Sequence, residues 1–137
     1  MMLNWKAILI GAAVDFIGTI FISVILAHLW ASALLLGGLS GDSARDALSN
    51  NPLFLAISAT VGWYFDYMGG KIAASFADNR KTLHAVIAVV PGILIGLFEI
   101  FTAPSLKYPI WFDCALCFAS IGFGYYGGVK ANQIKTS

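Results

Sequence analysis

Four stretches of apolar residues, each long enough to cross a lipid bilayer, constrain this sequence more than any other feature. They cover residues 7–29 (or 7–36), 53–74, 83–101 and 110–128. Crossing ~30 Å of hydrocarbon at ~1.5 Å per helical residue takes about 20 mainly apolar residues. Only 11% of the residues are charged, whereas soluble domains contain about 25%. We therefore predict an all-α protein, a single integral membrane domain over residues 1–137 in which four transmembrane helices form a bundle of two tandem helical hairpins.

The basic residues predict which way the chain faces. Six of them lie on the side of the two termini and of the loop between the second and third stretches: Lys6, Lys71, Arg80, Lys81, Lys130 and Lys135. Only Arg45 and Lys107 lie on the other side, so the positive-inside rule puts both termini in the cytoplasm. The first outer segment, "GGLSGDSARDALSNNP", has the glycine, serine, asparagine and proline content of a connection. A short amphipathic turn over residues 43–48 is the alternative there.

Asp15 lies inside the first apolar stretch, about ten residues beyond Trp5 and hence ~15 Å along the helix axis. A charge near the bilayer midplane costs roughly 2.5–3.5 kcal/mol, and loss of water favours the neutral acid. We expect a protonated or paired side chain that faces the interior. Two interpretations stay open: a proton or ion site made by Asp15, Thr19 and Asp66, or an interhelix hydrogen bond worth about 0.6 kcal/mol.

Small and polar residues recur on one side of each predicted helix at helical spacing. On the first three helices the series are Gly11-Asp15-Thr19-Ser23-Ala27, Ser58-Gly62-Asp66-Gly70-Ala74 and His84-Ala88-Gly92-Gly96. On the fourth helix the series is Asp113-Cys117-Ser120-Gly124-Gly127, at mixed spacings of three and four. In lipid, small residues let helix backbones approach closely, and polar groups form hydrogen bonds across the interface. The series predict compact packing with the polar residues inward, and close helix crossings at Gly62 and Gly96.

The remaining acidic residues in or near the apolar stretches predict anchoring rather than catalysis. Glu99 and Asp113 flank the short outer loop "TAPSLKYP" and should form an outer acidic cluster, in which Lys107 can pair with either. His28 and His84 lie near opposite faces and cannot share a metal ion, and no carboxylate-histidine spacing matches a helical di-metal site. We predict no metal and no cofactor.

Cys114 and Cys117 form a C-x-x-C pair in an apolar helix. Without a second pair or a βαβ context, we interpret them as two small residues one helical turn apart rather than as a redox or zinc motif.

Two helix ends share a sequence pattern. The second apolar stretch ends "FDYMGGKIA" and the fourth ends "FGYYGGVKA", and both lie on the cytoplasmic side. A parallel repeat of two helical hairpins would produce this pattern. The alternative is that aromatic residues, glycine and lysine are simply common where helices reach a membrane interface.

A resemblance rests on the segment "GGKIAASFADNRKTLHA", together with "VDFIGT" and "YPIW". The chain resembles uncharacterised small four-helix membrane proteins of bacteria over most of its length. The resemblance implies a bacterial inner-membrane location, a four-helix bundle and a cytoplasmic interface that contains Gly69, Gly70, Ala73 and His84. It brings no established activity. Lys71 stands where an apolar or aromatic residue is expected, which leaves the end of the second helix undecided.

Three classes of function follow, and none uses a nucleic acid. We predict a non-enzymatic accessory or assembly component whose partners are the lipid bilayer and either itself or a larger membrane protein complex. The alternative is a small channel or an ion- or proton-coupled transporter that uses the intramembrane acidic residues. A membrane enzyme is the least favoured class, because no set of polar residues converges at one depth.

Overall fold

The computed structural model describes residues 3–102 and 110–133, and all regular structure in this part is helical. It contains five helices: α1 Trp5–Leu36, α2 Gly41–Ser49, α3 Pro52–Ser75, α4 Lys81–Thr102 and α5 Ile110–Gln133. The all-α prediction is confirmed. The helix α3 continues through Gly69 and Gly70 to Ser75, so the glycine pair does not end it. The helix α1 continues to Leu36, the longer of the two predicted ends of the first stretch.

Side-chain caps determine where several helices begin. The Asn4 side chain accepts a hydrogen bond from the backbone N–H of Ala7 at the start of α1. At the start of α3, Asn51 accepts from the N–H groups of Leu53 and Phe54, and proline occupies the first position of the helix. Asparagine at the cap satisfies backbone donors that have no partner within the helix, and proline at the first helical position loses no hydrogen bond.

The first outer segment contains the helix α2, where a connection was the favoured prediction. Ser40 caps this helix and Asp42 lies in its first turn, where a negative charge is stabilised by the helix dipole. One face is buried, because Ala44 is 3% exposed and Leu48 is 7% exposed. Capping and burial of this face together explain why residues 41–49 are helical.

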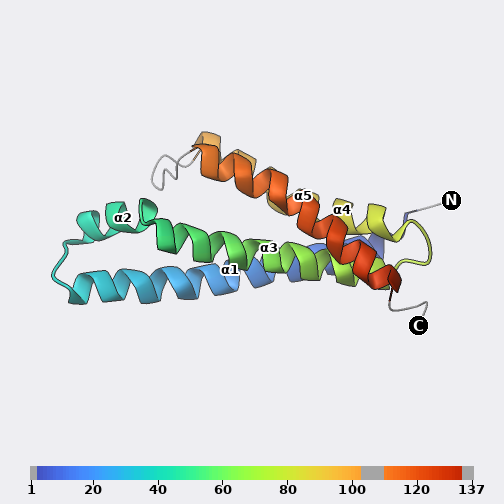
Figure 1. The fold of residues 1–137 in the computed structure, drawn as a ribbon, viewed down its shortest axis with the longest axis horizontal. Helices are drawn as coiled ribbons and strands as arrows, with labels where there is room; N and C mark the ends of the chain where they lie inside the picture. Colours follow the sequence, from blue (N-terminus) through green and yellow to red (C-terminus); the bar gives the residue numbers. More distant parts are fainter. Residues whose placement is uncertain (1–2, 103–109, 134–137) are drawn as a thin grey trace.

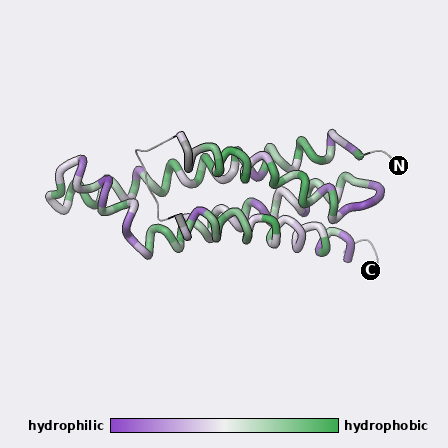
Figure 2. Tube along the Cα trace, turned by 90° about the horizontal axis from the view of Figure 1, so that it is seen from above, coloured by the Kyte–Doolittle hydropathy of each residue, from purple (hydrophilic) through white to green (hydrophobic). Residues whose placement is uncertain are grey.

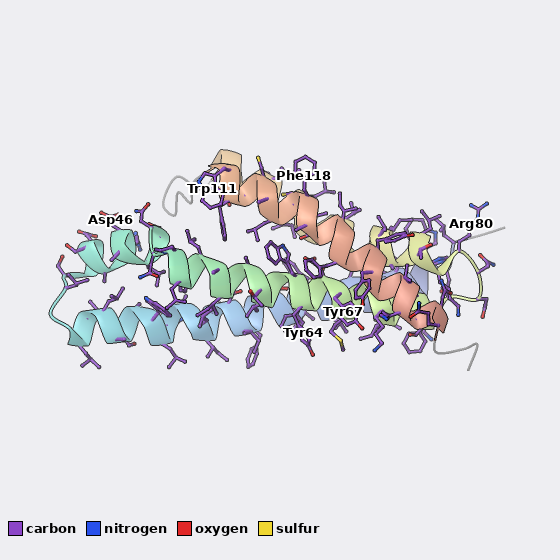
Figure 3. The ribbon with its side chains drawn as sticks, viewed as in Figure 1. Asp46, Tyr64, Tyr67, Arg80, Trp111 and Phe118 are labelled. Carbon is purple, nitrogen blue, oxygen red and sulfur yellow. The ribbon has the colours of Figure 1, made fainter. Side chains whose placement is uncertain are left out.

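The four long helices lie side by side and the two termini lie at one end of the molecule (Figure 1). The helices α1 and α3 form an antiparallel pair, and α5 crosses α3 at an angle, with α4 next to it. We call the end with both termini and the α3–α4 loop the terminal end, and the opposite end, which carries α2, the α2 end. Arg80 lies at the terminal end and Asp46 at the α2 end (Figure 3).

Packing differs between the two ends. Near the terminal end the fully buried residues are mostly alanines: Ala7, Ala73, Ala74, Ala85 and Ala88. Toward the α2 end α5 diverges from α3 (Figure 1), and the contacts there involve Phe112 and Leu116 of α5 and Trp63 of α3. Small residues therefore hold the helices close at one end, whereas large side chains fill the wider space at the other.

Within the described ranges, two helices are long and apolar enough to cross a membrane: α1, and α4 over residues 81–98. Only 17% and 22% of the residues in their most apolar windows are buried, so most residues of these windows are at least partly exposed. Phe118 of α5 also points away from the other helices (Figure 3). Figure 2 shows hydrophobic residues along the helices and hydrophilic residues gathered at the two ends. These features favour a membrane location.

The predicted helix crossings at Gly62 and Gly96 are wrong. A Cβ atom placed on either glycine would meet nothing within 4 Å. Residues four apart rotate gradually around a helix that has 3.6 residues per turn. The series that contains Gly62 therefore does not face the same neighbouring helix along its whole length. The close crossings lie nearer the terminal end, at Gly11 with Gly69 and at Gly70 with Gly124.

Candidate functional site

The structure brings two carboxyl groups from different helices together. Asp15 of α1 and Asp66 of α3 lie within hydrogen-bonding reach of one another. Both are buried, with Asp15 4% exposed and Asp66 7% exposed. We call these two groups the carboxyl pair. The sequence predicted them, with Thr19, as a candidate ion or proton site, and the three residues do lie together.

A close crossing of α1 and α3 places the carboxyl pair. A Cβ atom on Gly69 would lie 2.6 Å from the carbonyl oxygen of Gly11 and 2.7 Å from the Cβ atom of Asp15. Any side chain at Gly69 would therefore push the helices apart. Because Gly69 lies three residues after Asp66, it is on the adjoining part of the same helix face. The glycine thus permits the approach through which the two carboxyl groups meet.

Groups from all four long helices surround the carboxyl pair. The Ser120 hydroxyl of α5 lies within hydrogen-bonding reach of the Asp66 carboxyl. The buried Thr19 hydroxyl lies beside the Asp15 carboxyl but makes no well-aligned hydrogen bond to any described residue. The helix α4 contributes Gly92, where a Cβ atom would lie 3.6 Å from Oδ2 of Asp15. Pro91 precedes it inside the helix and cannot donate a backbone hydrogen bond.

This arrangement is suited to binding one positive charge. Two carboxylates in contact repel each other when both are ionised, so the pair is most stable when it holds a proton between the two groups. A small cation could replace that proton, with hydroxyl oxygens as further ligands. No group of three or more histidine, cysteine or acidic residues that could hold a metal ion occurs in the described part of the chain.

The residues predicted at the cytoplasmic interface lie in helix contacts at the terminal end. A Cβ atom on Gly70 would lie 2.5 Å from the carbonyl oxygen of Gly124 in α5. Ala73 is fully buried against Gly11 of α1. These positions therefore hold α3 against both α1 and α5.

His84 is 1% exposed and joins the start of α4 to the start of α1. Its Nε2 atom accepts a hydrogen bond from the backbone N–H of Asn4 at 2.8 Å, and its Nδ1 atom lies 3.0 Å from the carbonyl oxygen of Arg80. With Nε2 as the acceptor of this bond, Nδ1 is the ring nitrogen that faces the Arg80 carbonyl oxygen. The Asn4 side chain also donates to the carbonyl oxygen of Phe76, 3.1 Å away. The four residues tie α1, the end of α3 and α4 together.

The predicted outer acidic cluster falls largely outside the described part of the molecule, which leaves out the Glu99 side chain and Lys107. Asp113 lies in the first turn of α5 and is half-buried. Cys114 is exposed and Cys117 is partly buried, and both are free thiols.

The sequence interpretation missed an aromatic seam between α3 and α5. Trp63 stacks on Phe123 with ring centroids 5.4 Å apart, and the Tyr67 and Tyr126 rings are 5.8 Å apart. The sequence did contain a sign of this seam. Aromatic residues precede the glycine pair in both "FDYMGGKIA" of α3 and "FGYYGGVKA" of α5. Those segments pack against each other, because Gly127 contacts the backbone of Tyr67.

No known family matches the chain, and no curated protein or solved structure is significantly similar to it. The resemblance to small bacterial membrane proteins therefore stays a prediction. What the chain does must be inferred from the geometry of its own residues.

Proposed function

We propose that the chain is a four-span protein of the bacterial inner membrane that moves a proton or a small monovalent cation by way of the carboxyl pair. The buried contact between Asp15 and Asp66 carries this proposal. The sequence alone favours an accessory role. The contact instead favours a channel or an ion- or proton-coupled transporter, because a proton relay or an ion site uses acidic residues that lie next to each other inside the membrane.

The lengths of the helices support four spans. The four long helices have 32, 24, 22 and 24 residues, and each exceeds the about 20 residues that cross the hydrocarbon core. Both termini lie at the end that carries Arg80 (Figures 1 and 3). In this proposal the terminal end faces the cytoplasm and the α2 end faces outward.

The two ends give the carboxyl pair unequal surroundings. Buried alanines and the contacts of Gly70 pack the terminal side closely, whereas large side chains fill the space toward the α2 end. Thr19 and Ser120 both lie on the α2 side of the pair, so we expect the proton or cation to reach the pair from that side. There the Thr19 and Ser120 hydroxyls can pass a proton or coordinate a cation next to the carboxyl groups.

Flux through reconstituted vesicles tests the proposal. Vesicles with wild-type protein and an internal pH dye should equilibrate a pH gradient or pass a small cation, whereas Asp15→Asn and Asp66→Asn should each abolish the flux. Asp46→Asn is the matched control, because this residue is exposed on α2. Absence of flux from folded wild-type protein, with common ions and both signs of voltage, would reject the proposal.

An accessory role is the second candidate, and the close glycine and alanine crossings favour it. In that case the carboxyl pair only joins α1 to α3. Asp15→Asn should then change the free energy of unfolding by no more than about 1 kcal/mol. Wild-type vesicles should show no flux, and the protein purified in mild detergent should carry a second copy or a partner protein.

A further inference from the structure

A groove of about 300 Å³ runs along the aromatic seam between α3 and α5. Its lining consists of Thr60, Trp63, Tyr64, Tyr67, Phe123 and Tyr126. Asp66 is not among these residues, so the groove is separate from the carboxyl pair. The groove is open along one side, and its surface is almost wholly apolar. In the proposed membrane placement this open side faces lipid, and its chemistry suits an acyl chain.

Two lysines lie at the terminal-end side of the groove. The Lys71 ammonium is 5.8 Å from the centre of the Tyr67 ring, and the Lys130 ammonium is 5.4 Å from the centre of the Tyr126 ring. Lys130 also donates to the side-chain oxygen of Gln133. Among the described residues neither lysine has an acidic partner within ion-pair distance. Two positive charges therefore stand at the mouth of an apolar groove.

We propose that this groove binds an anionic phospholipid of the cytoplasmic leaflet. Its phosphate contacts Lys71 and Lys130, and one acyl chain lies along Trp63 and Phe123. Trp63 precedes Lys71 by eight residues, so it lies about 12 Å deeper in the membrane along α3. When a lipid phosphate contacts Lys71, the upper part of the acyl chain lies at the depth of Trp63. Tyrosines beside lysines are typical of the membrane interface, and basic residues at the cytoplasmic surface attract anionic lipids.

A second copy of the chain fits the groove less well. Two copies inserted in the same orientation and joined by this face would place the lysines of one copy against those of the other. Like charges so close together oppose association. An anionic headgroup instead neutralises both ammonium groups, so the charges favour lipid as the occupant.

Quenching of tryptophan fluorescence by brominated lipids tests the site, because bromine quenches only tryptophans that its acyl chain contacts. We would use a protein with Trp63 alone, made by W5F, W30F and W111F, in phosphatidylcholine vesicles. Brominated phosphatidylglycerol should reach half-maximal quenching at a mole fraction roughly ten-fold lower than brominated phosphatidylcholine. Adding K71Q and K130Q should abolish this preference.

The control substitutions K6Q and K81Q remove the same charge from the terminal end and should leave the preference intact. Equal quenching by the two lipids in the Trp63 protein would overturn the proposed site. An equal loss of the preference for phosphatidylglycerol in the K71Q/K130Q and K6Q/K81Q variants would also overturn it. Any positive charge at the terminal end would then attract the lipid equally well.

The proposed site rests on the proposed membrane placement, and a second reporter separates the two. Trp111 is 67% exposed on α5, so a protein with Trp111 alone should be quenched by both brominated lipids if the chain spans the membrane. Quenching of Trp111 without quenching of Trp63 would show that protein covers the groove and would overturn the lipid site alone. Quenching of neither would overturn the membrane placement as well.

Discussion

Replacing Gly70 with alanine tests a close approach of α3 and α5. The added Cβ atom would lie 2.5 Å from the carbonyl oxygen and 2.9 Å from the Cα atom of Gly124, whereas ordinary contacts lie at 3.4–4 Å. Both neighbouring atoms belong to the backbone, so the two helices must separate by about 1 Å. Overpacking of this kind costs about 1–3 kcal/mol, and alanine regains up to about 1 kcal/mol in helix propensity. With the full propensity gain, we expect a net loss of up to about 2 kcal/mol.

Gly62→Ala is the matched control on the same helix. A Cβ atom there meets nothing within 4 Å, so only the propensity gain remains, and stability should rise by up to about 1 kcal/mol. Both variants would be titrated with a denaturing detergent in mixed micelles while helix content is followed by circular dichroism. Equal stability of the two variants would refute the close crossing of α3 and α5.

Two further predictions concern the terminal end and the orientation. Asn4→Ala removes the helix cap and the hydrogen bond to the Phe76 carbonyl, so the same titration should show a loss of about 1 kcal/mol. Asn4→Asp keeps the cap and should lose less, and an equal loss would contradict the assigned capping. A cysteine at Ser43, in a protein with both native cysteines changed to serine, should react with an impermeant reagent outside intact cells, while a reporter after Ser137 reads cytoplasmic. The reverse pattern would invert the orientation.

The helices of this protein were largely predictable from the sequence because each is encoded locally. Long apolar stretches form helices, and Asn4 and Asn51 mark where two of them begin by capping backbone donors. The inward face of α1 was also predictable. Gly11 and Asp15 are its small and polar members, and both are buried.

The helix crossings were not predictable in the same way. Which glycine meets a neighbour depends on the angle at which two helices pass, and one helix's sequence does not contain that angle. Gly62 and Gly70 belong to the same four-residue series, yet only Gly70 touches α5. The sequence predicted that Ser120 faces inward, but the contact of Ser120 with Asp66 and the aromatic seam depend on the same angle, so these two features appeared only in the structure.

The unequal packing of the two ends connects the glycine crossing to the carboxyl pair. The crossing of Gly70 with Gly124 lies one turn from Asp66 on α3 and one turn from Ser120 on α5. Beyond it, toward the α2 end, the two helices contact each other through large side chains such as Trp63 and Phe112. A change that separates α3 from α5 at the crossing therefore also moves Ser120 relative to Asp66. We therefore expect Gly70→Ala to reduce proton or cation flux in protein that remains folded, because it displaces the Ser120 hydroxyl from the carboxyl pair. Unchanged flux in a destabilised Gly70→Ala protein would show that the crossing serves packing alone.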